Sequence, residues 1–156
     1  MKKLLAMVLA LVMTLSLAVS ANAAFKDADK VSADYSEAVA VLNGMGVFKG
    51  YEDGSFQPQG NITRAEVATI FFRLLTEEVR TANSTQSNSL SDVTRGQWFN
   101  HAVSTLSSMG IVKGHNDGTF APNAPITRAE FAAICARFDS GKAEENSGFT
   151  DISGHW

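Results

Sequence analysis

The sequence predicts an all-α fold made of two tandem helix–loop–helix repeats. The first observation is the phrase Ile-Thr-Arg-Ala-Glu, which occupies residues 62–66 and again 126–130. The second is that the surrounding segments, 38–74 and 102–138, align without a gap at an offset of 64 residues. The third is that apolar residues in each copy recur every three or four positions, which is the period of a helix. One helix pair cannot bury its apolar face alone, so neighbouring repeats are expected to pack together.

Residues 1–23 have the pattern of a secretory signal peptide. Lys2 and Lys3 precede an apolar run, residues 4–19, and the segment closes with Ala-Asn-Ala. A transmembrane anchor is the alternative, but the run is shorter than the ~20 residues that span a bilayer. Cleavage removes two of the 13 Lys and Arg, which leaves 11 against 16 Asp and Glu and a net charge of −5. This balance argues against a nucleic-acid-binding protein. Because no second long apolar run exists, we expect a secreted chain without a membrane span.

The first helix of each repeat is predicted from one apolar face. This face comprises Ala38, Val41, Leu42 and Met45 in the first copy, and Ala102, Leu106 and Met109 in the second. Gly46 and Gly110 follow directly, where a glycine that ends a helix is expected. The loop that comes next holds an Asp-Gly turn in both copies. We expect Phe56 and Phe120 to hold this loop onto the core.

The second helix of each repeat begins at the repeated phrase. Thr63 as N-cap and Glu66 as the third helical residue make a capping box. Thr127 and Glu130 repeat it in the second copy. The apolar residues that flank each box add a hydrophobic staple. Loss of such a cap costs on the order of 1 kcal/mol, so most of the phrase has a structural explanation.

The arginine of the phrase needs another explanation. Arg64 and Arg128 fall at the first helical position, where the helix dipole disfavours a cation by roughly 0.3–1 kcal/mol. Free amides, the dipole and a guanidinium together suit an anion, so an acidic ligand is one hypothesis. The other hypothesis is a salt bridge to an aspartate of a lead-in segment, Asp27, Asp92 or Asp151. The residues alone leave both open.

No constellation of catalytic, metal-binding or cofactor-binding residues is evident. Cys135 is the single cysteine, so no intramolecular disulfide is expected, and its apolar neighbours indicate a buried small side chain. The loop around Gly118 fails as an EF-hand, because Lys113 and Ala124 occupy its first and last ligand positions. The three histidines lack metal-ligand spacing, and no P-loop or Gly-x-Ser-x-Gly motif occurs. We therefore expect neither enzyme activity nor a cofactor.

The whole pattern resembles the S-layer homology (SLH) module. The resemblance rests on "GYEDGSFQP" and "GHNDGTFAP", each followed by the Ile-Thr-Arg-Ala-Glu phrase, and it covers nearly all of the chain outside the leader and linkers. It implies modules that pack as a three-part helical spindle, with ligand in the grooves between them. The expected organisation is a signal peptide (1–23), module 1 (24–76), a linker (77–89), module 2 (90–139), a linker (140–148) and the start of a truncated module 3 (149–156). The spindle would then be incomplete.

The resemblance also implies a function, which is non-covalent anchoring of a secreted protein to the cell wall at the cell surface. The partner would be secondary cell-wall polysaccharide, often carrying ketal-linked pyruvate, or a peptidoglycan-linked polymer. The candidate ligand-binding residues are Arg64 and Arg128, followed by the weaker candidates Gly46, Gly110, Lys49 and Lys113. A pyruvate carboxylate fits the anion hypothesis. His115 replaces Tyr51, so the two grooves are expected to differ.

Two alternatives stay open, and each needs a further domain. The chain would be the anchor portion of a truncated secreted hydrolase, or that of a surface-layer lattice subunit. Because the third module is incomplete, one groove would lack a wall. Self-association of chains is one way to complete it.

Overall fold

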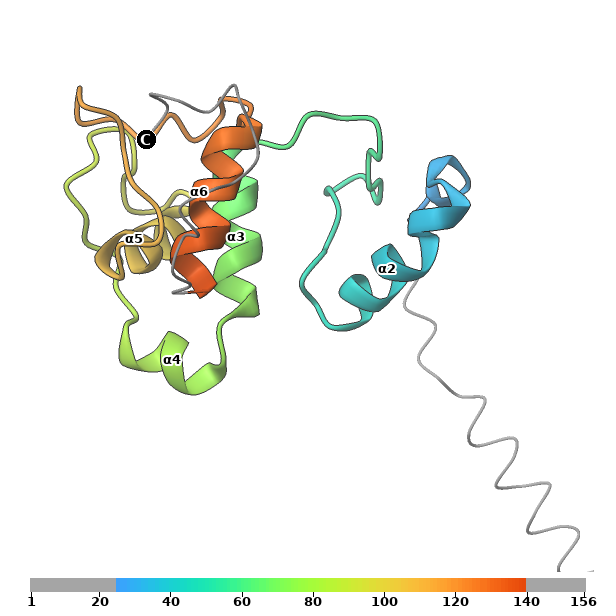
Figure 1. Ribbon diagram of the computed structural model, residues 1–156, viewed down its shortest axis with the longest axis horizontal. Coiled ribbons are helices and arrows are strands. Elements are labelled where there is room, and N and C mark those ends of the chain that lie inside the picture. Colours follow the sequence, from blue (N-terminus) through green and yellow to red (C-terminus); the bar gives the residue numbers. More distant parts are fainter. Residues whose placement is uncertain (1–24, 140–156) are drawn as a thin grey trace, which may run out of the picture. The chain divides into compact units, whose positions relative to one another are not determined.

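The computed structural model describes residues 25–139 (Figure 1). The predicted signal peptide, the second linker and the third lead-in fall within residues 1–24 and 140–156, which lie outside the described residues. The helices of the described range are η1 (Ala28–Lys30, a 3-10 turn), α2 (Ala33–Gly44), α3 (Arg64–Leu74), α4 (Glu77–Ala82), α5 (Asn100–Ser108) and α6 (Arg128–Asp139). No β-strand occurs in this range, so the all-α prediction is confirmed.

The chain divides into two compact units, residues 1–58 and 59–156. Each is described by itself, through its residues 25–58 and 59–139. The boundary falls ahead of α3, so the second helix of the first repeat belongs to the same unit as the second repeat. The module boundaries given by the sequence stay a prediction.

Both first helices end in the same hydrogen-bonded turn. In α2, Gly46 has φ +73° and its amide donates to the carbonyl of Asn43 (2.9 Å). The end of α5 is alike, since Gly110 has φ +74° and its amide donates to the carbonyl of Ser107 (3.0 Å). This is the Schellman motif, in which glycine takes a left-handed conformation without a steric penalty. The predicted helix-ending glycines are therefore confirmed.

An aspartate of each lead-in segment holds the loop of its own repeat. The Asp92 carboxylate accepts hydrogen bonds from the amides of Phe120 and Ala121, at 2.7 and 2.8 Å. Asp27 makes the equivalent pair of bonds in the first unit, at 2.8 and 2.9 Å. The second amide of each pair belongs to a non-glycine residue with positive φ, which is 54° at Ala121. The carboxylate thus holds backbone that would otherwise be strained.

The unit formed by residues 25–58 leaves much of its helix uncovered. Phe56 packs against Phe25 and Phe48, with ring centroids 5.1 and 5.5 Å away, so it holds the loop as predicted. Helix α2, however, contains no buried residue. On its predicted apolar face, Val41 is 53% exposed and Met45 is 66% exposed. The predicted helix is present, but burial of that face within this unit is not.

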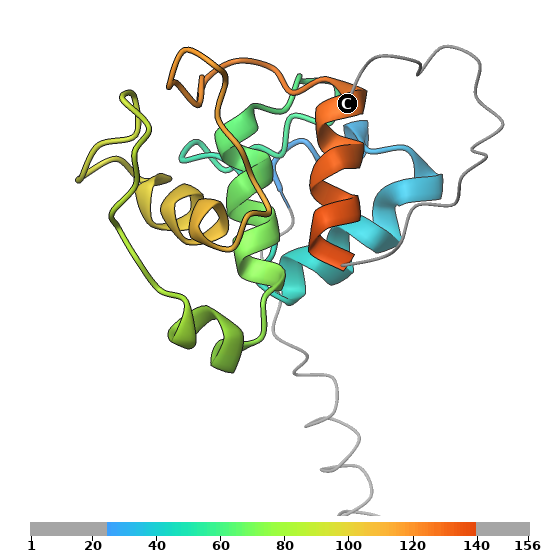
Figure 2. The same cartoon turned by 60° about the vertical axis from the view of Figure 1, so that its left-hand side comes forward.

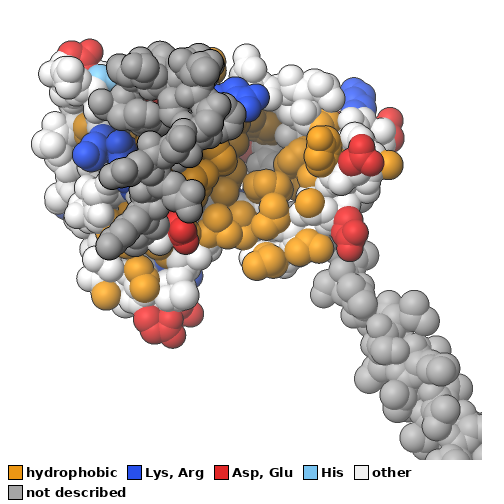
Figure 3. All heavy atoms as spheres, viewed as in Figure 1, with side chains coloured by type: hydrophobic (Ala, Val, Ile, Leu, Met, Phe, Trp, Pro, Cys, Tyr) orange, Lys and Arg blue, Asp and Glu red, His pale blue; other side chains and the backbone are white. Residues whose placement is uncertain are grey.

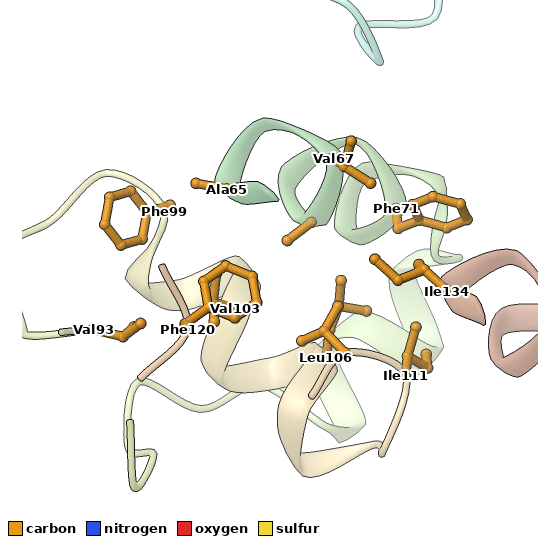
Figure 4. Close-up of a cluster of buried hydrophobic side chains, with 12 residues drawn as sticks. Ala65, Val67, Phe71, Val93, Phe99, Val103, Leu106, Ile111, Phe120 and Ile134 are labelled. Carbon is orange, nitrogen blue, oxygen red and sulfur yellow. The ribbon is translucent and has the colours of Figure 1, made fainter. Parts of the chain in front are cut away.

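The hydrophobic core lies in the unit formed by residues 59–139. Helix α3 packs across α5, and their side chains interdigitate with the loop that carries Phe120 (Figure 4). The residues with 0–1% exposure in this core are Ala65, Val67, Ala68, Val103, Leu106, Val112 and Phe120. Helix α6 runs beside α3 in both ribbon views (Figure 2), and Phe71 meets Phe138 there at a centroid distance of 5.0 Å. The second repeat thus completes its core with a helix from the first.

The segment after α3, which was expected to be a linker, is helical in its first part. Helix α4 starts anew, with the hydroxyl of Thr76 accepting a hydrogen bond at its N-cap. Further along, Asn88 donates to the hydroxyl of Ser104 (2.8 Å), and the Thr85 amide donates to the hydroxyl of Thr105 (3.2 Å). These bonds hold the second half of the segment against α5.

Candidate functional site

Both copies of the repeated phrase form a capping box. The Thr63 amide donates to the Glu66 carboxylate (2.7 Å), and the Glu66 amide donates to the Thr63 hydroxyl (3.3 Å). Thr127 and Glu130 make the same reciprocal pair, at 2.9 and 3.2 Å. The boxes place the arginine that follows each threonine at the first helical position.

Arg64 is buried at the contact between the two repeats, and its side chain is 8% exposed. Its Nε donates to the carbonyl of Phe120 (2.7 Å), and its Nη2 donates to the carbonyl of Lys113 (3.1 Å). Its Nη1 pairs with the carboxylate of Glu130. The guanidinium also lies 4.8 Å from the centroid of the Phe120 ring. All of these partners belong to the second repeat, so the arginine of the first repeat joins the two.

The amides that begin α3 are also engaged. The Arg64 amide donates to the carbonyl of Ala124, and the Ala65 amide donates to the carbonyl of Pro122, both at 3.0 Å. The third amide is bonded to the capping threonine. A ligand at this helix would therefore meet only the guanidinium, and not the free amides that the anion hypothesis invoked.

The alternative hypothesis, a salt bridge to a lead-in aspartate, is wrong for Arg64. The partner is Glu130, which lies 66 residues along the chain. Asp27 and Asp92 are each occupied by two amides of their own loops. Asp151 lies outside the described residues. Asp27 and Asp92 thus accept hydrogen bonds from backbone amides and do not pair with the Arg64 guanidinium.

Glu130 serves two partners at once. One carboxylate oxygen accepts the hydrogen bonds of its capping box, and the other pairs with Arg64. Partial burial raises the pKa of this carboxyl, but the two hydrogen bonds from Thr127 and the charge of Arg64 hold the pKa below its ordinary value. The start of α6 and the junction of the repeats therefore depend on the same ionised carboxylate.

A surface pocket of about 300 Å³ opens beside this ion pair. It is lined by Arg64, Val112, Lys113, Gly114, His115, Ala129, Glu130, Ala133, Ile134 and Arg137. The charge of Arg64 is balanced by Glu130, whereas Lys113 and Arg137 are exposed and add two positive charges. The arrangement suits a small anionic group such as a carboxylate.

The pocket gathers two of the predicted ligand residues, Arg64 and Lys113. Gly110 lies in the same unit but ends α5 and does not line the pocket. Gly46 and Lys49 belong to the other unit. Arg128 is exposed at the start of α6, and its side chain has no partner among the described residues. The role of all six as ligand contacts stays a prediction.

Arg137 lines the pocket, although it was not among the residues predicted from the sequence. The helical period could have indicated that Arg137 shares a face of α6 with Glu130. Four lining residues of this helix, at i, i+3, i+4 and i+7, are Glu130, Ala133, Ile134 and Arg137. His115 was singled out only as a replacement for Tyr51, and the structure places it in the same pocket.

No group of three or more His, Cys, Asp or Glu side chains that could hold a metal ion is found between residues 25 and 139. In the same range, no helix has the length and apolar character needed to cross a membrane.

Comparison with known proteins places both repeats in one family. The family model of the S-layer homology domain matches residues 24–68 and 89–132. The chain is 39% identical over 114 residues to a cellulosome-anchoring protein of Acetivibrio thermocellus, an alignment that covers 69% of this chain and 26% of the relative. It is 35% identical over 141 residues to the middle cell wall protein of Brevibacillus brevis, covering 88% of this chain and 13% of the relative.

An enzyme is also among the similar proteins. An amylopullulanase of Thermoanaerobacterium thermosulfurigenes is 34% identical over 121 residues, which cover 75% of this chain and 6% of the relative. The chain therefore spans no more than about a quarter of the length of any of these three relatives.

Proposed function

Because this chain belongs to the S-layer homology domain family, we propose that it is a non-catalytic anchoring module that holds a secreted protein to the cell wall. Relatives named as a cellulosome-anchoring protein and a middle cell wall protein support this function and a place at the cell surface. The similarity to an amylopullulanase is confined to 6% of that enzyme, so it supports an anchor and not a hydrolase.

We propose that the ligand is an acidic group on a cell-wall polymer. Secondary cell-wall polysaccharide with ketal-linked pyruvate, or a peptidoglycan-linked polymer, would supply such a group. The observation that carries this proposal is the excess positive charge of the pocket at the junction of the repeats. Lys113 and Arg137 would pair with the carboxylate, while the buried Arg64 would hold the two walls of the pocket together.

Three further proposals come from the resemblance and from the relatives. Arg128, Gly46, Gly110 and Lys49 would contribute to other grooves, each formed with a neighbouring module. The chain would be the anchor portion of a longer hydrolase or of a surface-layer lattice subunit. Self-association would pack repeats of neighbouring chains against one another.

The test is retention of the secreted chain on purified cell-wall sacculi, with and without chemical removal of the secondary polymer. The decisive variant is Lys113→Ala/Arg137→Ala, because both side chains are exposed and their loss should leave the fold intact. Each charge-assisted hydrogen bond contributes about 1.5–3 kcal/mol, so each substitution on its own should weaken binding roughly 10- to 150-fold. The matched control is Arg95→Ala, an exposed arginine outside the pocket. Equal retention of the double variant and the control would refute the assignment of this pocket.

A further inference from the structure

Equivalent positions of the two repeats have different surroundings. Tyr35 of α2 and Phe99 before α5 stand 64 residues apart, yet Tyr35 is 68% exposed and Phe99 is 4% exposed. Val39 is half-buried and lines a groove of about 150 Å³ beside α2, whereas its equivalent Val103 is fully buried. Figure 3 shows apolar side chains uncovered over α2. The same helix face is thus covered in the second repeat and bare in the first.

The cover on α5 is the second helix of the preceding repeat. Helix α3 packs on α5, and Ala65 and Phe99 belong to the same buried cluster (Figure 4). Ala68 of α3 is completely buried, as expected where a small side chain lets two helices approach closely. At the start of the same helix, the Arg64 guanidinium donates to the carbonyl groups of Phe120 and Lys113. One junction therefore has a donor side, the start and face of α3, and an acceptor side, α5 with its loop.

Each chain carries one unused copy of each side within its described residues. On α6, Arg128 is exposed and without a partner, and Ala132, the equivalent of the buried Ala68, is exposed as well. On the acceptor side, the carbonyl groups of Phe56 and Lys49 accept no hydrogen bond from the described residues, although those of their equivalents bind Arg64. The unused donor side thus offers the same arginine and alanine as α3, and the unused acceptor side offers the same two carbonyl groups as the loop after α5.

We propose that α6 of one chain docks on α2 and the following loop of a second copy of the chain, and so repeats the packing of α3 on α5. Arg128 would enter the loop that carries the Phe56 and Lys49 carbonyls, and Ala132 would approach the face marked by Tyr35. The contact joins different surfaces of the two chains, so it is heterologous, and an assembly that does not close into a ring keeps one unused donor side at one end and one unused acceptor side at the other. This inference rests on the proposed self-association and is independent of polymer binding.

The test uses two variants that each block one side. Ala132→Arg blocks the donor side and Tyr35→Arg blocks the acceptor side, and both positions are exposed, so neither change disturbs a buried contact. Ala82→Arg, an exposed alanine of α4, is the matched control. The mass of residues 24–156 is measured by sedimentation equilibrium without polymer, and circular dichroism checks the fold.

The wild type and Ala82→Arg are expected to exceed the mass of one chain, increasingly so at higher concentration. Each blocking variant alone should stay at one chain. An equimolar mixture of the two should reach two chains, because one intact junction remains between them. The proposal is overturned by a wild type of single-chain mass at every concentration, by association of either blocking variant alone, or by a mixture that stays monomeric. Retention of the monomeric variants on sacculi would show separately whether wall anchoring holds.

Discussion

Replacing Arg64 with alanine should destabilise the unit formed by residues 59–139 by about 3 kcal/mol. The change removes charge-assisted hydrogen bonds to the carbonyls of Phe120 and Lys113, each of which contributes roughly 1.5–3 kcal/mol. It also leaves Glu130 without its guanidinium. Loss of one member of a buried pair costs roughly 3–5 kcal/mol, and the lower end applies because the Glu130 side chain is 32% exposed. The contributions overlap, so they do not add in full.

The sequence provides a matched control, because Arg128 occupies the same position of the second phrase. Its side chain is exposed and unpartnered among the described residues, so Arg128→Ala should change stability by no more than about 0.5 kcal/mol. Urea unfolding followed by far-ultraviolet circular dichroism measures both free energies, at a concentration low enough to exclude association. Losses of equal size in the two variants would refute the assignment of Arg64 as the contact between the repeats.

Three more predictions follow from the same unit. Asp92→Ala should cost about 2 kcal/mol in urea unfolding, because the amides of two loop residues lose their acceptor and Ala121 keeps a positive φ. An unchanged midpoint would contradict this. Thr63→Ala should cost about 1 kcal/mol through loss of the N-cap, and Thr63→Ser should restore most of it; equal losses would rule out capping. Because the pKa of Glu130 is depressed on folding, its contribution is complete above the unfolded pKa of about 4.3 and disappears as pH falls toward the lower folded pKa. Glu130→Gln should therefore flatten the stability profile as pH falls below the unfolded pKa, and an unaltered slope would contradict the pKa assignment.

Local features were predicted well because they depend on neighbours in the chain. The helix-ending glycines need only the backbone of the preceding turn, and Gly46 and Gly110 stand where expected with φ near +73°. The capping boxes join residues three positions apart, and both formed at Thr63 and Thr127. The aromatic side chains of the loops, Phe56 and Phe120, also pack as predicted.

The candidate site was predicted in part. Lys113 and Arg64 were named from the family pattern, and both line the pocket. Arg137 was missed because an arginine near the end of a helix has many ordinary explanations, and only the pocket shows that it faces the same space as Lys113. Gly110 was named but lies outside the lining, since its role is to end α5.

The sequence by itself determined the elements, their ends and their duplication, because helix period, caps and glycine turns act over a few residues. Only the tertiary structure decided the partners of those elements. Arg64 and Arg128 lie in identical phrases, yet among the described residues Arg64 is buried against Glu130 of the following repeat and Arg128 is exposed. Phe99 is buried at the start of α5, on which α3 of the preceding repeat packs, whereas the equivalent Tyr35 is exposed. A repeated sequence specifies the same surface twice, but burial depends on whether a neighbour is present to cover it.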